Sequence, residues 1–120
     1  MSMIDTPVTE AMARFLDVSV FRHALITSNL ANIDTPGYRA RDLNFALEME
    51  RANNGFEYAV FSPAVRQVQG LTERPDGNNV SLERESLLLA ETQMRFNLAI
   101  QLLRDQFHNI SAAIHEGSAS

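Results

Sequence analysis

The last third of the chain carries seam residues at alternating steps of four and three over more than four heptads. This spacing keeps them on one face of an α-helix and is typical of a coiled-coil seam. We therefore expect a long helix over residues 81–115, with Ser81 as its N-cap and an end near His115, because Gly117 follows. The seam residues are Leu82, Ser86, Leu89, Gln93, Phe96, Ile100, Leu103, Phe107, Ile110 and Ile114.

Near the N-terminus a second stripe has the same spacing. Thr6 is placed to cap a helix that has Pro7 at its first helical position, and Pro36 and Gly37 would end it. We expect this helix over residues 7–33. Its seam residues are Met12, Leu16, Ser19, His23, Ile26, Leu30 and Ile33.

Residues 34–80, between the two stripes, are less regular. Asp42 is a candidate N-cap for a short helix through LNFALEMERA, and the segment FEYAVFSPAVRQVQ favours one or two short strands or an extended arm. The stretch PDGNNVS is rich in turn residues. The sequence thus predicts a mainly α fold in one domain of residues 1–120. Its long N- and C-terminal helices pair as a coiled-coil-like core, joined by an irregular middle segment.

Two long helices that pack against each other cover one face each, and both predicted helices carry large apolar residues off that face. Two explanations remain open: the middle segment covers these residues, or neighbouring subunits do. The second is favoured, because a large exposed apolar surface usually marks an interaction site. The residues are Val18, Phe21, Leu25, Leu87, Leu88, Met94, Leu98 and Leu102.

The composition argues against several classes of function. The net charge of −5 and the pI of about 5.1 argue against nucleic-acid binding, which needs clustered positive charge. The chain has no cysteine, so disulfides and thiol chemistry are not available to it. The start of the chain, MSMIDTPVTEAMARFLD, lacks a basic region followed by an uninterrupted apolar run, so we expect no cleaved signal peptide.

No constellation of reactive side chains points to catalysis. His108 and His115 are seven residues apart, which is about 10 Å along a helix and too far to hold one metal ion without another element. No nucleophile stands in a recognisable elbow, and the five glycines form no phosphate loop. We expect no enzyme activity, metal, cofactor or small-molecule substrate. His23 lies on the first seam, where a hydrogen-bonded core or interface histidine is expected.

The stretch SNLANIDTPGY gathers small polar side chains around the predicted end of the first helix. In one interpretation Asn29 and Asn32 hydrogen-bond to backbone at the helix end and in the adjoining loop, while Tyr38 anchors the turn against a helix. In the other, the asparagines are solvated residues at a helix end. The first interpretation makes the stretch an architectural motif.

This stretch resembles the N-terminal signature of bacterial flagellar axial proteins, which are the rod, hook and hook-associated families. Ile33 departs from the signature, since these proteins usually have a small residue there. The segments YRARDLNF and DGNNVSLERESLLLAETQMRFNLAIQLL resemble the FlgB family of rod proteins, with the FlgC family as the nearest alternative. The residues that match the signature are Ser28, Asn29, Leu30, Ala31, Asn32, Thr35, Pro36, Gly37 and Tyr38.

The resemblance implies a structural subunit of the proximal rod of the flagellar basal body, in the periplasm. Such subunits pack helically around a central channel and transmit torque from motor to hook. The implied partners are further copies, FlgC and other rod proteins, FliE at the membrane-ring junction, and the flagellar type III export apparatus, which exports rod subunits without a cleaved signal peptide. The matched motif and the two seams would then be assembly surfaces.

The alternative is a free-standing helical adaptor or export chaperone of the type III system, which would use the same seams to hold a client. An adaptor would be a stable folded dimer on its own. A rod subunit would instead be partly disordered at its ends until it assembles.

Overall fold

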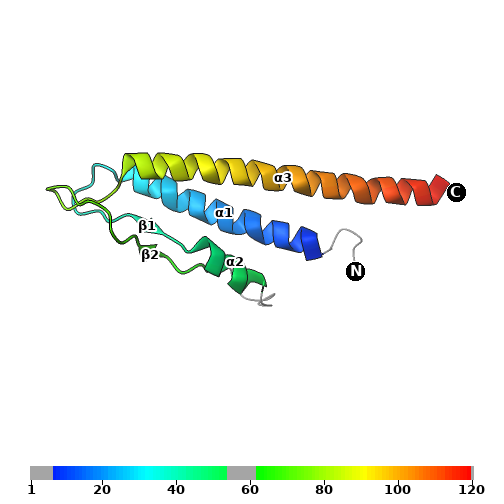
Figure 1. The fold of residues 1–120 in the computed structure, drawn as a ribbon, viewed down its shortest axis with the longest axis horizontal. Helices are drawn as coiled ribbons and strands as arrows, with labels where there is room; N and C mark the ends of the chain where they lie inside the picture. Colours follow the sequence, from blue (N-terminus) through cyan, green and yellow to red (C-terminus); the bar gives the residue numbers. More distant parts are fainter. Residues whose placement is uncertain (1–6, 54–61, 120) are drawn as a thin grey trace.

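The computed structural model describes residues 7–53 and 62–119 of the chain. Within these residues the chain is mainly helical, with a long helix near each end and two short strands in the irregular middle, as the sequence predicts (Figure 1). The elements in chain order are α1 (Pro7–Ala31), β1 (Arg41–Asp42), α2 (Phe45–Asn53), β2 (Arg66–Gln67) and α3 (Leu82–Ala119).

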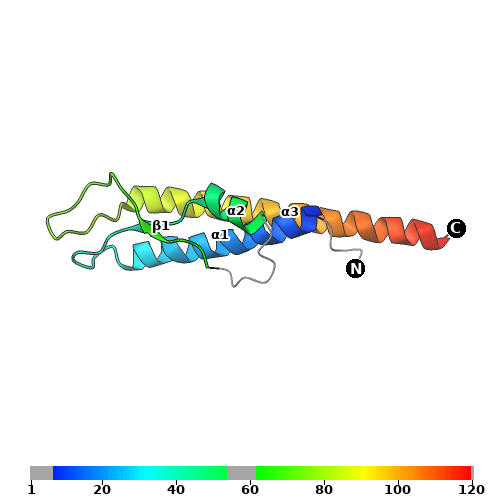
Figure 2. The ribbon, with the colours of Figure 1, turned by 90° about the horizontal axis from the view of Figure 1, so that it is seen from below.

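Helix α1 lies in the middle of a flat, elongated molecule that measures 72 × 27 × 18 Å. Helix α3 runs antiparallel to it on one side, so that the C-terminal end of α1 lies beside the N-terminal end of α3 (Figures 1 and 2). On its other side α1 contacts α2 and β1. The antiparallel pair of β1 and β2 aligns Arg41 with Gln67 and Asp42 with Arg66. Helix α3 continues well beyond the N-terminal end of α1.

Two faces of α1 are buried because the helix has neighbours on two sides. On the side of α2, the ring of Phe15 meets that of Phe45 edge-on, at a centroid distance of 5.1 Å, and Val18 is completely buried one turn further on. On the side of α3, Ser19 is buried and lines a groove together with Thr92. The buried apolar side chains, among the described residues, are Val18, Ile26, Ala40, Leu43, Val80 and Ala99.

Helix α3 faces α1 with positions other than the centre of its predicted seam. Glu85, Thr92 and Ala99, spaced seven apart, are buried, whereas Leu82 and Ser86 at the start of the predicted seam are exposed. Small side chains at Thr92 and Ala99 allow the backbones to approach closely, and this rotates the packed face away from the larger leucines.

Some predicted helix ends are wrong. Helix α1 ends at Ala31, two residues earlier than predicted. Helix α3 does not end near His115 but runs through Gly117 to Ala119. A glycine inside a helix costs only about 1 kcal/mol relative to alanine, so it ends a helix only where the chain also reverses. The predicted cap Thr6 lies outside the described residues.

The predicted caps of the other two helices have opposite outcomes. Ser81 is confirmed as the N-cap of α3, because its Oγ accepts a hydrogen bond from the backbone N–H of Arg84 at 3.2 Å. Asp42 is wrong as the cap of α2. The helix begins two residues later than predicted, and Asn44 Oδ1 caps it by accepting from the backbone N–H of Leu47 at 3.1 Å. The side chain of Asp42 binds arginines on the two long helices instead.

Candidate functional site

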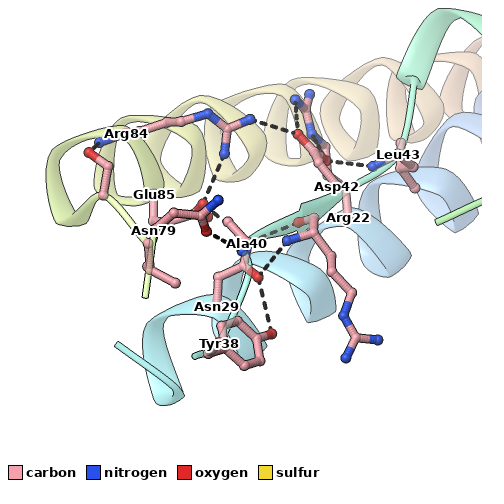
Figure 3. Close-up of polar contacts among 12 residues, drawn as sticks. Arg22, Asn29, Tyr38, Ala40, Asp42, Leu43, Asn79, Arg84 and Glu85 are labelled. Atoms are coloured by element: carbon pink, nitrogen blue, oxygen red, sulfur yellow. Dashed lines mark hydrogen bonds and ion pairs between the residues drawn. The ribbon is translucent and has the colours of Figure 1, made fainter. Parts of the chain in front are cut away.

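Asn29, in the last turn of α1, joins three segments of the chain through one buried side chain (Figure 3). Its Nδ2 donates to the carbonyl of Arg41 at 2.8 Å and to Glu85 Oε1 at 3.1 Å. Its Oδ1 accepts from the backbone N–H of Arg41 at 3.0 Å and from the Tyr38 hydroxyl at 3.2 Å. The amide thus pairs with both backbone groups of one residue, as a neighbouring strand would, and also contacts α3.

The side chain of Asn32, one turn further along, makes local contacts only. Its Nδ2 donates to the carbonyl of Ser28 at 2.8 Å, and its Oδ1 accepts from the hydroxyl of Thr35 at 3.1 Å. These two hydrogen bonds are exposed. They shape the turn that follows α1, but they do not connect it to another element.

The loop that precedes α3 donates additional hydrogen bonds to carbonyls of the turn after α1. Asn78 is completely buried, and its Nδ2 donates to the carbonyls of Asn32, Ile33 and Thr35 at 2.9–3.0 Å. Arg74 also donates to the carbonyl of Ile33. A helix leaves its last carbonyls unpaired and carries partial negative charge there, so an amide and a guanidinium are well suited to this position.

Two glycines allow the two loops to touch. Gly37 and Gly77 have positive φ values of 76° and 87°, which L side chains rarely adopt. The backbone N–H of Gly37 donates to the carbonyl of Asp76 at 2.9 Å. A Cβ on Gly77 would lie only 3.3 Å from the Cα of Gly37, so the loops can approach this closely only without a side chain there.

Asn79 holds the segment that leads into β1. Its Oδ1 accepts from the backbone N–H of Ala40 at 2.7 Å, and its own backbone N–H donates to the carbonyl of Tyr38 at 3.2 Å. The hydroxyl of Tyr38 lies 3.2 Å from both Ser28 Oγ and Asn29 Oδ1. The turn after α1 is therefore fixed to the same helix and to the loop before α3.

A cluster of charges completes this arrangement, as Figure 3 shows. Asp42 of β1 accepts a two-pronged contact from Arg22 of α1, at 3.2 and 3.1 Å, and a third contact from Arg84 of α3 at 3.2 Å. Arg84 also donates to Glu85 Oε1 at 2.9 Å. One carboxylate thus links α1, β1 and α3. We call the whole set of contacts among residues 22–42 and 74–85 the junction.

Glu85 is the least satisfied member of the junction. Its side chain is completely buried, and Oε2 has no hydrogen-bond partner. Burial raises the pKa of its carboxyl above the ordinary value of 4.5, and the charge of Asp42 acts in the same direction. The hydrogen bond from Asn29 and the nearby Arg84 oppose this shift but do not cancel it.

The structure divides the motif residues into buried and exposed members. Asn29 is buried, and Leu30, Asn32 and Tyr38 are half-buried, whereas the remaining motif residues are exposed: Ser28, Ala31, Thr35, Pro36 and Gly37. Sequence reasoning missed the residues that contact the motif, which are Arg74, Asn78, Asn79 and Glu85. The signal that could have found them is DGNNVSLERE, in which two adjacent asparagines precede a cap. This segment contacts the motif within the junction.

The predicted seam residues take different places. Ile26 is buried, and Phe107 and Ile114 of α3 are exposed. His23 and Phe96 line a groove of about 290 Å³ between α1 and α3. Gln93 is exposed and also lines this groove. The predicted seam residues that are half-buried are Met12, Leu16, Leu30, Ile33, Leu89, Ile100, Leu103 and Ile110.

Helix α3 also has an exposed apolar stripe. Leu87, Met94, Leu98 and Leu102 are exposed by 69%, 66%, 59% and 46%. Leu87 and Met94 each follow a buried position of the packed face by two residues, which is more than half a turn of helix. Leu87 and Met94 therefore point away from α1, whereas Leu98 and Leu102 lie one residue before and three residues after the buried Ala99, nearer the packed face. We call these four residues the outer stripe.

Two other kinds of site are absent from the part of the chain that the structure describes. No group of three or more histidine or acidic side chains is arranged to hold a metal ion there. None of the helices described is both long and apolar enough to cross a membrane.

Comparison with known proteins gives a consistent result. A family model described as flagella basal body rod protein matches residues 22–39, which span the end of α1 and the turn of the junction. A FlgB rod protein of Cereibacter sphaeroides is 35% identical over 106 residues, covering 78% of this chain and 82% of the relative. This chain belongs to the FlgB family of flagellar basal body rod proteins. FlgB proteins of Salmonella typhimurium and Escherichia coli are 28% and 27% identical. Each alignment is 123 positions long and covers 86% of this chain and 89% of the relative.

Membership in the FlgB family decides between the two families that the sequence markers left open. It identifies the chain as a structural component of the flagellar basal body, which serves motility. The motif that carries the resemblance and the DGNNVSLERE segment are far apart in the sequence, but they meet in the junction.

Proposed function

We propose that the chain is a subunit of the proximal rod that assembles helically with its neighbours, transmits torque from motor to hook, and catalyses no reaction. The outer stripe carries this proposal. Its four large apolar side chains lie on α3 and are 46–69% exposed in the subunit. Surfaces of this kind on a soluble chain are the usual mark of protein interfaces.

The shape of the subunit also supports assembly. A chain 72 Å long and 18 Å thick buries little of its own apolar surface, so contacts between subunits have much to add. The stripe and the groove lined by His23 and Phe96 lie on different faces of the helix pair. Unlike faces that meet between copies generate rings or open helical assemblies, and a rod needs the second kind.

We further propose the partners and the location that the family implies. The partners are further copies of the chain, FlgC and other rod proteins, FliE and the type III export apparatus. The location is the periplasmic rod, reached without a cleaved signal peptide. The motif from Ser28 to Tyr38 serves assembly indirectly, because it fixes how α1 and α3 lie against each other. The exposed seam residues Phe107 and Ile114 provide further contact surface.

The double variant Met94→Glu/Leu98→Glu tests this proposal in cells. We expect it to be exported at the normal level but to leave rods incomplete and cells non-motile, because it places charge in an apolar interface. Met94→Leu/Leu98→Met is the matched control, since it keeps the surface apolar and should keep motility. Normal motility of the charged variant would refute the proposal.

Measurements on the purified chain test it against the adaptor alternative. A rod subunit is expected to be monomeric at low concentration, with helix content that rises as it assembles. Size-exclusion chromatography and circular dichroism over a concentration series measure both. A stable, fully helical dimer at low concentration would favour the adaptor.

A further inference from the structure

The carboxyl of Glu85 occupies an unusual place in the junction. Its side chain is completely buried near the start of α3. Oε1 accepts hydrogen bonds from Asn29 Nδ2 and Arg84 Nη1, at 3.1 and 2.9 Å, whereas Oε2 has none. An ionised carboxylate has lone pairs for about four hydrogen bonds. One of its two oxygens is therefore removed from water without compensation.

The charged groups that act on this carboxyl come from α3 and β1. Arg84 lies beside it on α3 and shares its guanidinium with Asp42 of β1. Arg22 of α1 is already engaged by both oxygens of Asp42. The Tyr38 hydroxyl bonds to Asn29 and not to the carboxyl. Two carboxylates thus share two guanidiniums, and Asp42 takes three of the four guanidinium contacts in the cluster.

This geometry favours the protonated form of Glu85 when the junction is closed. A buried charge with an unpaired oxygen is expensive, and protonation removes the charge while Oε1 still accepts from Asn29. When the junction opens, water solvates both oxygens and the carboxyl ionises at its ordinary pKa. The two states of the junction therefore bind protons differently.

We propose that Glu85 makes closure of the junction proton-linked: the carboxyl takes up a proton from solvent when α1, β1 and α3 come together, and releases it when they separate. The device lies within the fold and does not depend on assembly with other subunits. Closure is favoured at mildly acid pH and becomes weaker as the pH rises.

The sign follows from the linkage relation. In the pH range between the ordinary pKa and the raised pKa, the closed state binds more protons than the open state, so stability falls as pH rises. Below this range Glu85 is protonated in both states and contributes no pH dependence. Each unit by which the pKa of the closed state exceeds the ordinary value changes the folding equilibrium constant tenfold across the range.

The test compares the full chain with Glu85→Gln at pH values from about 4 to 8, the range in which a carboxyl with a raised pKa titrates. Urea unfolding followed by circular dichroism gives the folding equilibrium constant of each. We expect the ratio of the constants for wild type and Glu85→Gln to fall as pH rises, by tenfold for each unit that separates the pKa of Glu85 in the closed and open states. Glu83→Gln is the matched control, because Glu83 is exposed in the same helical turn and should leave the wild-type profile unchanged.

A direct titration keeps the test independent of whether the variant folds. Carbon-13 NMR of the Glu85 carboxyl in the wild-type chain is expected to give a pKa above the ordinary value of 4.5. Contacts between the side chains of Asn29 and Glu85 in the same spectra report that the junction is closed. An ordinary pKa for Glu85 would overturn the proposal, as would parallel pH profiles for wild type and Glu85→Gln or a junction that is open at every pH.

Discussion

Replacing Asn29 by alanine should destabilise the subunit far more than the same change at Asn32, although the two belong to one motif. Asn29 makes four hydrogen bonds to other segments, and Asn32 makes two exposed bonds within its own turn. Two partners of Asn29 keep another contact after the change: Glu85 retains Arg84, and Tyr38 retains Ser28.

The loss at Asn29 therefore falls on the backbone N–H and carbonyl of Arg41. A part-buried backbone group left without a partner costs about 1–3 kcal/mol, so we expect Asn29→Ala to lower the free energy of unfolding by about 3 kcal/mol. For a chain of this length that corresponds to a fall in Tm of about 10 °C. Asn32→Ala should cost below about 1 kcal/mol, because water can replace its exposed bonds.

Urea unfolding of the wild-type chain and the two variants, followed by far-ultraviolet circular dichroism, measures both changes. Similar m-values in the three chains would show that the same folded state is compared. Equal losses for the two variants would refute the reasoning, because they would mean that the junction contacts of Asn29 add nothing to the local ones.

Three further predictions concern other parts of the junction. Gly77→Ala should lower Tm more than Gly70→Ala. Both positions have positive φ, but only a Cβ at Gly77 meets backbone, and equal losses would contradict this close approach. Asn78→Ala should cost about 1–3 kcal/mol in urea unfolding, because the buried N–H of Val80 loses its partner, while the three carbonyls each keep another donor; a loss below about 1 kcal/mol would exclude a structural role for this amide. Asp42→Asn should cost about 2 kcal/mol, because it removes the charge that pairs with Arg22 and one of the two carboxylates that pair with Arg84, and unchanged stability at low salt would refute it.

The two long helices could be predicted from the sequence because a period of four and three reports which residues share a face. The rotation of α3 about its axis could not be predicted in the same way. Its packed face is centred on Glu85, Thr92 and Ala99, and two of these are polar. A rule based on apolar periodicity assigns such positions to the edge of the packed face. Thr92 and Ala99 are buried because they are small, and Glu85 is buried where it accepts a hydrogen bond from Asn29 of α1.

The junction was harder to predict for a related reason. Asp42 looks like a helix cap when only its neighbours in the sequence are considered, but its arginine partners lie 20 and 42 residues away. Asn78 looks like part of a turn, although its amide closes the end of a helix more than 40 residues earlier. Local pattern rules contain no information about such distant partners.

The division between polar and apolar contacts explains how one short chain can have a fixed helix register and also keep an apolar surface for binding neighbours. Apolar contact is not directional, so two helices joined only by apolar stripes can slide or rotate against each other. Hydrogen bonds to backbone groups have fixed geometry, and the junction places them at one end of the helix pair. That end sets the register of α1 and α3. The apolar residues of the outer stripe are then not needed to define the fold of the subunit, which leaves them free to bind neighbours.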